Sequence, residues 1–120
     1  AAGRADLSRY VMADFGREVT RDVDWLLGAV LLVRRQALEQ VGLLDERFFL
    51  YFEDADWCRR FRIDSWRVVY FADASMVHFH ERASARVSWP LFALSRASRM
   101  HVASWYKYFR KWGRSEGVKE

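Results

Sequence analysis

The alternation of hydrophobic and polar positions predicts a short series of strands and helices. Residues 26–33 (Leu-Leu-Gly-Ala-Val-Leu-Leu-Val) form an apolar run of strand length. Because this run lacks polar alternation, we expect a strand that is covered on both faces, as in parallel α/β sheets. Residues 36–41 predict a short helix, and Gly42 is a favourable residue to end it.

A second helix is predicted at residues 53–63, after a loop at residues 43–52. Its first turn is acidic and its later turns are basic, which is the order that the helix dipole favours. The loop carries five consecutive bulky side chains at residues 48–52, and some of these must pack or line a pocket because their joint exposure is costly. The spacing within the helix gives it an apolar face that consists of Trp57, Cys58 and Phe61.

The rest of the chain predicts two more strands and one long helix. We expect strands at residues 68–71 and 75–79 and a helix over residues 90–112. Pro90 is compatible with this helix because proline is tolerated in a first turn. Residues 1–22 show no sustained period and suggest a loop with one short helix near residues 7–15. The long helix has an apolar stripe of Val102, Trp105, Phe109 and Trp112 and a basic stripe of Arg96, Arg99, Lys107, Arg110 and Arg114.

Composition indicates one folded domain of 120 residues, or part of one, because 52% of the residues are hydrophobic and 17% are aromatic. Cys58 is the single cysteine, so neither a disulfide nor a multi-cysteine zinc site can form within the chain, and a reducing, cytoplasmic setting fits. The longest apolar run, residues 25–33, is far shorter than the roughly 20 residues of a membrane-spanning helix.

The positive charge is concentrated near the end of the chain. Residues 1–85 carry 12 Lys/Arg and 14 Asp/Glu, a net charge of −2, whereas residues 86–120 carry 8 and 2, a net charge of +6. This asymmetry predicts an anionic partner for the second segment: membrane lipid, nucleic acid or an acidic protein surface.

A set of residues between Trp25 and His78 has an informative order and spacing. The order is Trp25-Leu26-Leu27-Gly28-Ala29, Arg34-Arg35, Val41-Gly42-Leu43-Leu44-Asp45-Glu46-Arg47-Phe48-Phe49, Tyr51-Phe52-Glu53-Asp54-Ala55-Asp56-Trp57-Cys58-Arg59-Arg60, Trp66-Arg67-Val68 and Val77-His78. It resembles the second half of the catalytic domain of family 2 glycosyltransferases, particularly rhamnosyltransferase-like members, over about residues 23–112.

This resemblance implies an α/β fold of the GT-A (nucleotide-diphospho-sugar transferase) type, present here in part, with short strands, flanking helices and a long C-terminal helix. It implies transfer of a sugar, with inversion, from a nucleotide-sugar donor to a hydroxyl of a cell-surface polysaccharide or lipid-linked glycan. Asp54 matches the general base of the family's Glu-Asp motif, with Glu53 beside it. Trp25, Gly28 and Ala29 match an element near the acceptor site.

The chemistry of these residue types agrees with that assignment. An acceptor hydroxyl is a poor nucleophile, so a carboxylate must take its proton. A helix N-terminus favours such a negative charge and fixes its orientation. Gly28 permits close approach of the backbone to a ligand. Trp25, Phe49 and Tyr51 offer flat, rigid surfaces for the apolar faces of sugar rings.

Each of these residues also has a structural interpretation. Glu53 and Asp54 could simply complement the dipole of their helix, because acidic first turns are common. Trp25 and the aromatic loop could belong to the core. Asp56 is expected to be solvated or paired with an arginine, and Cys58 is expected to pack as a small apolar group.

The resemblance leaves the donor side of the reaction outside this chain. The family's N-terminal half supplies the nucleotide pocket and an Asp-x-Asp metal motif; residues 22–24 and 54–56 fit the letters but stand where the family has other elements. We therefore expect a divalent metal, Mg²⁺ or Mn²⁺, whose main ligands lie outside the chain, and an isolated fragment without activity. His78 matches a metal-binding histidine of some members, although it could equally be a strand-end residue, and His80 competes for the role. Ser65 stands where the family usually has glycine, and serine in a left-handed cap carries a cost.

The chain accordingly divides into a variable segment (residues 1–22), the acceptor-side half of the catalytic domain (residues 23–88) and a basic amphipathic helix and tail (residues 89–120). The apolar stripe within residues 90–112 either lies on an anionic membrane or packs on the catalytic half. A half-domain exposes sheet edges, so a homo-dimer is a further expectation.

The alternative is a non-catalytic, basic, aromatic-rich module that binds nucleic acid or a membrane surface, or that oligomerises. We expect no nucleic-acid partner, because the aromatic residues lie in apolar runs and are not interleaved with Lys/Arg across one sheet face. The expected location is the cytoplasm, at the inner face of the cell membrane.

Overall fold

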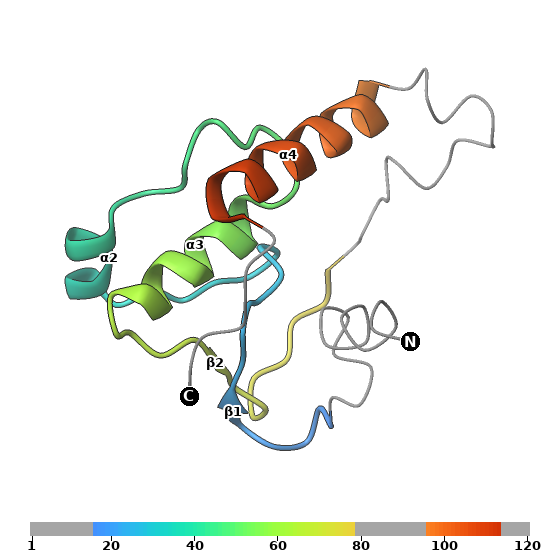
Figure 1. The fold of residues 1–120 in the computed structure, drawn as a ribbon. Coiled ribbons are helices and arrows are strands. Elements are labelled where there is room, and N and C mark those ends of the chain that lie inside the picture. The colour runs from blue at the N-terminus through green and yellow to red at the C-terminus, as the bar shows by residue number, and fades with distance from the viewer. Residues whose placement is uncertain (1–15, 79–95, 114–120) are drawn as a thin grey trace, which may run out of the picture.

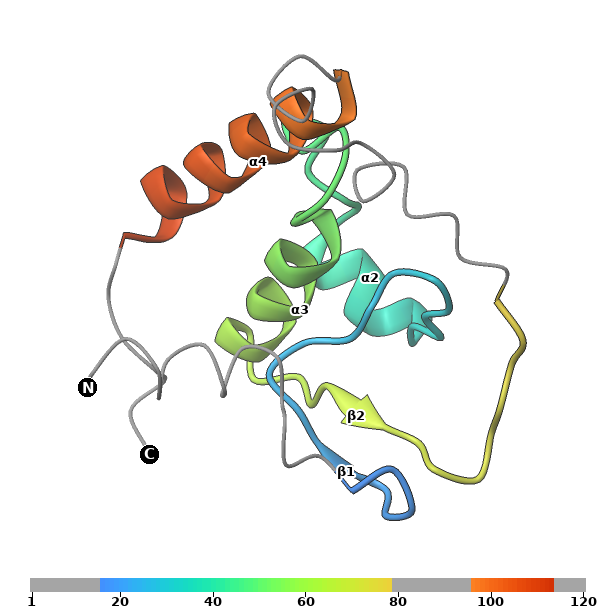
Figure 2. The same ribbon diagram turned by 90° about the vertical axis from the view of Figure 1, so that its right-hand side faces the viewer.

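The computed structural model describes residues 16–78 and 96–113 of the 120-residue chain. A central helix, α3, has the helix α4 on one side and a pair of short strands on the other (Figure 1, Figure 2). No helix in the described part is long and apolar enough to cross a bilayer. In chain order the elements are β1 (Arg21–Asp22), α2 (Arg35–Val41), α3 (Glu53–Ile63), β2 (Val69–Tyr70) and α4 (Arg96–Trp112).

The core forms where α2 and α3 pack against β2 and the chain that leaves β1. Burial raises the pKa of the Cys58 thiol, so this cysteine packs as a neutral group, as the sequence predicted. Trp57 and Phe61, the other residues of the predicted apolar face, pack in a tilted arrangement with ring centroids 5.2 Å apart. The buried members are Ala37, Cys58, Phe61 and Val68, surrounded by the half-buried Val23, Trp25, Leu26, Val33, Val41, Trp57 and Trp66.

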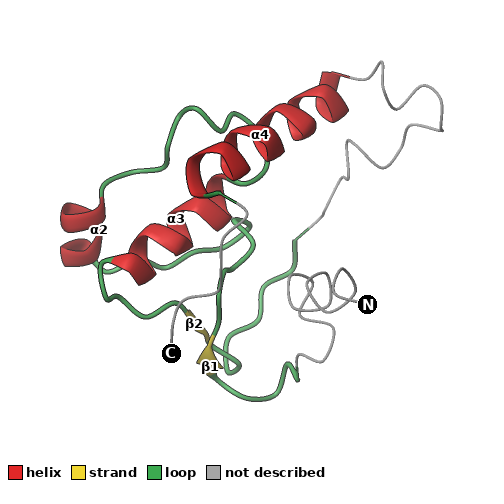
Figure 3. Ribbon diagram, viewed as in Figure 1, coloured by secondary structure: helices red, strands yellow, loops and turns green. Residues whose placement is uncertain are grey.

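The helices predicted at residues 36–41 and 53–63 are confirmed (Figure 3). α2 begins one residue earlier than predicted and ends at Gly42, whose φ of 84° lies in the left-handed region that favours glycine. The N–H of Gly42 donates to the Leu38 carbonyl at 2.8 Å and so satisfies an acceptor at the end of the helix.

α4 confirms the predicted long helix over the part that the structure describes. It ends at Trp112, as predicted, and the following Gly113 has a φ of 72°. Residues 90–95, which were expected to form its first turns, lie outside the described residues. The short helix expected near residues 7–15 lies outside them as well.

α3 ends in a left-handed cap at Ser65, whose φ is 65°. The N–H of Ser65 donates to the Arg62 carbonyl at 3.1 Å, and the N–H of Trp66 donates to the Phe61 carbonyl at 2.8 Å. These two bonds form a Schellman motif, which turns the chain so that Trp66 packs back on the core. The left-handed conformation predicted for this serine is therefore confirmed.

The strands form an antiparallel pair, so the parallel sheet expected from the sequence is wrong for the described residues. Each strand has only two residues, and the register pairs Arg21 with Tyr70 and Asp22 with Val69. The N–H of Val23 extends the pairing by donating to the Val68 carbonyl at 2.9 Å. The strand predicted at residues 68–71 is thus confirmed in place and shorter in extent.

The strand predicted at residues 26–33 is wrong. Residues 28–30 form a turn, and Leu32 is 101% exposed. No strand in the described residues lies beside this run, so its backbone groups have no ladder to join; the N–H of Gly28 binds a side chain instead. The strand predicted at residues 75–79 is also wrong for residues 75–78, which form none, and residue 79 lies outside the described part.

Candidate functional site

Asp54, the predicted general base, lies in the first turn of α3 and is 8% exposed. Each of its carboxylate oxygens accepts one backbone hydrogen bond: the N–H of Gly28 donates to Oδ2 at 2.8 Å, and the N–H of Ala55 donates to Oδ1 at 2.8 Å. A carboxylate offers about four acceptor positions, so these bonds fix the group and leave further lone pairs. The helix N-terminus favours the negative charge at this place.

Gly28 is the residue that allows two distant parts of the motif to meet. A methyl group at its Cα would lie 3.4 Å from both Cβ and Oδ2 of Asp54. The sequence predicted that this glycine permits close approach to a ligand, whereas the structure shows its close approach to the predicted base. Gly28 and Ala29 are both exposed, so the Trp25–Ala29 element meets the Glu-Asp motif at the surface.

Two successive residues in the left-handed region lead into α3. Tyr51 has a φ of 65° and Phe52 a φ of 69°. A left-handed backbone conformation costs a bulky residue about 1–3 kcal/mol, and it persists only where the surrounding groups hold it in place. α4 holds both rings: Tyr51 lies 4.4 Å from His101 and Phe52 lies 5.3 Å from Tyr108, measured between ring centroids. This strained turn directly precedes the acid pair.

The predicted acceptor-binding aromatics have different surroundings. Phe49 is 76% exposed, so its ring can meet a ligand. Tyr51 is half-buried against α4, and Trp25 is half-buried and packs on the core. The core interpretation is therefore confirmed for part of the aromatic set, and the role of these residues toward an acceptor stays a prediction.

Glu53 lies beside Asp54 in an environment that disfavours its charge. Its Oε2 atom is buried and has no hydrogen-bond partner among the described residues. Burial raises the pKa of Glu53, and the neighbouring Asp54 carboxylate raises it further. Glu53 therefore binds a proton at higher pH than an ordinary glutamate does, which is a property of groups that exchange protons in active sites.

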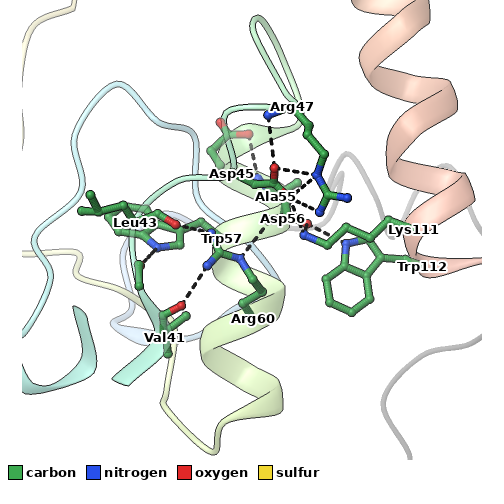
Figure 4. Close-up of polar contacts among 12 residues, drawn as sticks. Val41, Leu43, Asp45, Arg47, Ala55, Asp56, Trp57, Arg60, Lys111 and Trp112 are labelled. Atoms are coloured by element: carbon green, nitrogen blue, oxygen red, sulfur yellow. Dashed lines mark hydrogen bonds and ion pairs between the residues drawn. The ribbon is translucent and has the colours of Figure 1, made fainter. Parts of the chain in front are cut away.

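Asp56 is the centre of a polar cluster that the sequence did not predict (Figure 4). The residue is 0% exposed; its Oδ1 accepts from Trp112 Nε1 at 2.8 Å and lies 2.7 Å from Lys111 Nζ, and its Oδ2 accepts from Arg60 Nε at 3.0 Å. The predicted pairing with an arginine is confirmed. The predicted alternative of solvation is wrong, because the last turn of α4 covers this carboxylate.

Lys111 connects this cluster to a second acid, Asp45. Its Nζ lies 2.8 Å from Asp45 Oδ2, and Arg47 donates to both oxygens of Asp45 through Nη2 at 2.6 Å and Nε at 2.8 Å. Arg47 foremost, and Lys111 after it, hold the pKa of Asp45 well below its usual value. The neighbouring Lys107 Nζ donates to the Arg47 carbonyl at 2.9 Å. Partners 60 to 66 residues apart carry no local signal, so only the structure reveals this connection.

The residues suggested for a metal do not come together in the described part. Asp22 and Asp24 each pair with an arginine. His78 is exposed near the end of the first described range, and His80 lies outside it. Residues 16–78 and 96–113 contain no group of three or more His, Cys, Asp or Glu side chains that could hold an ion. The described residues alone therefore do not form a metal site.

Comparison with protein families identifies the class to which this arrangement belongs. The family described as "Glycosyltransferase like family 2" matches residues 4–99, a range that includes Gly28 and the acid pair. The chain belongs to this family, as the resemblance in the sequence indicated. No solved structure matches the chain.

Two relatives are named as rhamnosyltransferases. The N-acetylglucosaminyl-diphospho-decaprenol L-rhamnosyltransferase of Mycobacterium tuberculosis (strain ATCC 25618 / H37Rv) is 44% identical over 66 residues, which cover 55% of this chain and 22% of the relative. Rhamnosyltransferase WbbL of Escherichia coli (strain K12) is 30% identical over 91 residues, which cover 74% of this chain and 31% of the relative. The match spans less than a third of either relative.

Proposed function

We propose that this chain is the acceptor-side part of an inverting glycosyltransferase that moves a sugar from a nucleotide-sugar donor to a hydroxyl of a glycan or lipid-linked acceptor. Membership of family 2 supports sugar transfer. The names of the relatives favour rhamnose as the sugar, and the mycobacterial name favours an acceptor linked to a lipid through a diphosphate. Such an acceptor places the reaction at a membrane, and we propose its cytoplasmic face.

In this proposal the described residues are part of a GT-A domain whose nucleotide-binding half lies outside them. That half supplies the donor pocket and most of the ligands of a divalent metal, to which His78 contributes at most one. The 120-residue chain on its own is then inactive, because it lacks the groups that hold the donor.

The observation that carries the proposal is the fixed carboxylate of Asp54 beside the exposed Gly28–Ala29 turn. An acceptor hydroxyl that docks on this turn donates a hydrogen bond to a free lone pair of Asp54. As the hydroxyl oxygen bonds to the anomeric carbon, Asp54 takes the proton. The bond from that carbon to the diphosphate breaks on the opposite side, and the nucleotide diphosphate leaves with the electron pair. Attack opposite the leaving group inverts the anomeric carbon.

In this proposal the acceptor-binding surface combines a backbone segment with an exposed aromatic ring. Trp25, Gly28 and Ala29 form the segment that meets Asp54, and the exposed ring of Phe49 offers a flat face to a sugar. Tyr51 contributes indirectly, since α4 holds its ring and its left-handed backbone sets the start of the helix that bears the acid pair.

The test uses the full-length product of the gene with Asp54→Asn. We expect kcat to fall by about 10²- to 10⁴-fold, the contribution of a general base, while the affinity for the nucleotide-sugar donor stays within a few fold. Retained donor binding shows that the variant is folded, which matters because an amide at this position faces two backbone N–H donors.

Asp64→Asn is the matched control, because Asp64 is an exposed acid at the opposite end of the same helix. We expect its turnover to equal that of the wild type. Turnover of Asp54→Asn within threefold of the control, with unchanged donor binding, would remove Asp54 as the base. Transfer by the purified 120-residue chain would contradict the proposed division between donor and acceptor halves.

A further inference from the structure

α4 presents three different faces, and one of them carries the ring contacts and ion pairs to the loop before α3 and to α3 itself. His101, Tyr108 and Lys111 contact the aromatic loop and the polar cluster of Asp45 and Asp56. These residues recur at helical spacing, so they define a single docking face. The two remaining faces of the helix point away from α3.

The second face is apolar and exposed. Val102, Trp105, Tyr106 and Phe109 are between 38% and 60% exposed, and the spacings 102/105/109 and 102/106/109, of three and four residues, place them on one side of the helix. The rings of Trp105 and Phe109 pack in a tilted arrangement with centroids 5.1 Å apart. The sequence left open whether the apolar stripe packs on the catalytic half. In the structure Val102, Trp105 and Phe109 keep 57%, 50% and 38% of their surface exposed, whereas Trp112 is half-buried and contacts Asp56.

The third face is basic and lies next to the apolar one. Arg96, Arg99 and Arg110 are exposed, and α4 contains no acidic residue. Arg96 and Arg99 also line an open surface pocket with Met100 and Ala103. The two lysines of α4 differ from these arginines, because their ammonium groups bind the protein.

We infer that the outer side of α4 binds the surface of an anionic phospholipid bilayer. Trp105, Tyr106 and Phe109 would enter the boundary between head groups and acyl chains, where amphipathic aromatic rings are stable. The arginine face beside them meets the lipid phosphates, and the docking face keeps the helix on the domain. Charge complementarity selects this partner: a second copy would bring two basic faces together, whereas an anionic bilayer matches the apolar and basic faces at once. The inference rests on the surface of α4 and not on the proposed transfer reaction.

The test measures co-sedimentation of the full-length gene product with vesicles of phosphatidylcholine alone and with one third phosphatidylglycerol. We expect binding to the anionic vesicles only, and weaker binding at high salt. The triple variant Arg96→Gln, Arg99→Gln, Arg110→Gln should lose affinity by about 100-fold, because each basic residue near the surface contributes about fivefold. The double variant Trp105→Ser, Phe109→Ser should also lose at least about tenfold, since it removes the inserted rings.

A matched triple variant separates α4 from general electrostatics. Arg17→Gln, Arg34→Gln, Arg35→Gln removes the same charge from exposed arginines outside α4, and its affinity should stay within about threefold of the wild type. Equal loss in both triple variants would overturn the inference, as would absence of binding. Unchanged binding of the Trp105/Phe109 variant would overturn it too. A change in oligomeric state of that variant without vesicles would assign the face to a second copy instead. Because no donor or acceptor is present, failure here leaves the Asp54 proposal untouched.

Discussion

Replacing Asp56 by asparagine should strongly destabilise the chain, because three donors converge on this buried carboxylate. Asparagine has the same shape, but its amide group must face either Arg60 or the Lys111–Trp112 pair, and both are donors. Removing one partner of a buried ion pair costs about 3–5 kcal/mol. Lys111 keeps Asp45 as a partner, so we expect the lower end, about 3 kcal/mol.

The assay is urea unfolding of the 120-residue chain, followed by tryptophan fluorescence. With a slope of about 1.5–3 kcal/mol per molar urea, the loss corresponds to a midpoint shift of about 1–2 M. Asp22→Asn provides the control, because Asp22 also pairs with an arginine, Arg67, but the two side chains are 60% and 74% exposed. Water screens a surface pair of this kind, so its loss should be small beside that of Asp56→Asn.

This reasoning is refuted if the loss of stability for Asp56→Asn lies within about 1 kcal/mol of the loss for the control, because a difference that small is what exposed ion pairs produce. A double-mutant cycle with Lys111→Met adds a sharper criterion. Contacting charged residues should show a coupling of at least about 0.5 kcal/mol, and additive losses would mean that Asp56 stabilises the fold without α4.

Three further predictions concern single positions. Ser65→Gly should stabilise the chain by about 0.5–1 kcal/mol in thermal unfolding, because it relieves a left-handed serine, whereas Ser65→Ala should be neutral. Glu53→Gln should become more stable relative to the wild type as pH rises from 4 to 7. The raised pKa of Glu53 means that the wild type loses stability as this group ionises. A stability difference between the two proteins that stays constant across this range would contradict the prediction. Asp45→Asn should lose most stability at neutral pH and least near pH 2. The lowered pKa of Asp45 stabilises the folded wild type above the ordinary value of 3.8, and this stability is lost as pH falls through the folded value. Acid titrations of the variant and the wild type, followed by fluorescence, should therefore show the two stabilities converging.

Local features of the fold were predictable because their causes are local. The charge order of α3, the glycine after α2 and the serine at a left-handed cap each act within a few residues, and the structure confirms all three. Gly28 and Asp54 were both singled out through the family motif, and the structure adds that they contact each other. The apolar run at residues 26–33 misled the prediction, because strand formation depends on a neighbouring strand that the run itself cannot specify.

The orientation of α4 was not predictable for a different reason. Hydrophobicity singles out the face of Val102 and Trp105, yet the helix docks through His101, Tyr108 and Lys111. Ring contacts to the left-handed turn and ion pairs to Asp45 and the buried Asp56 determine this choice, and these partners lie far away in the chain. Sequence patterns rank faces by apolarity, so they overlook a face whose partners are specific polar and aromatic groups.

The polar cluster of Asp56 also sets a boundary for anyone who shortens this protein. Its partners Lys111 and Trp112 belong to the final turn of α4, so a chain shortened to end before Lys111 loses two of the three groups that bind the most deeply buried acid of α3, one a counter-charge and one a neutral N–H donor. Expression designs that trim the basic end to improve solubility should therefore keep residues through Gly113, or they will yield a product in which Asp56 has lost its Lys111 counter-charge.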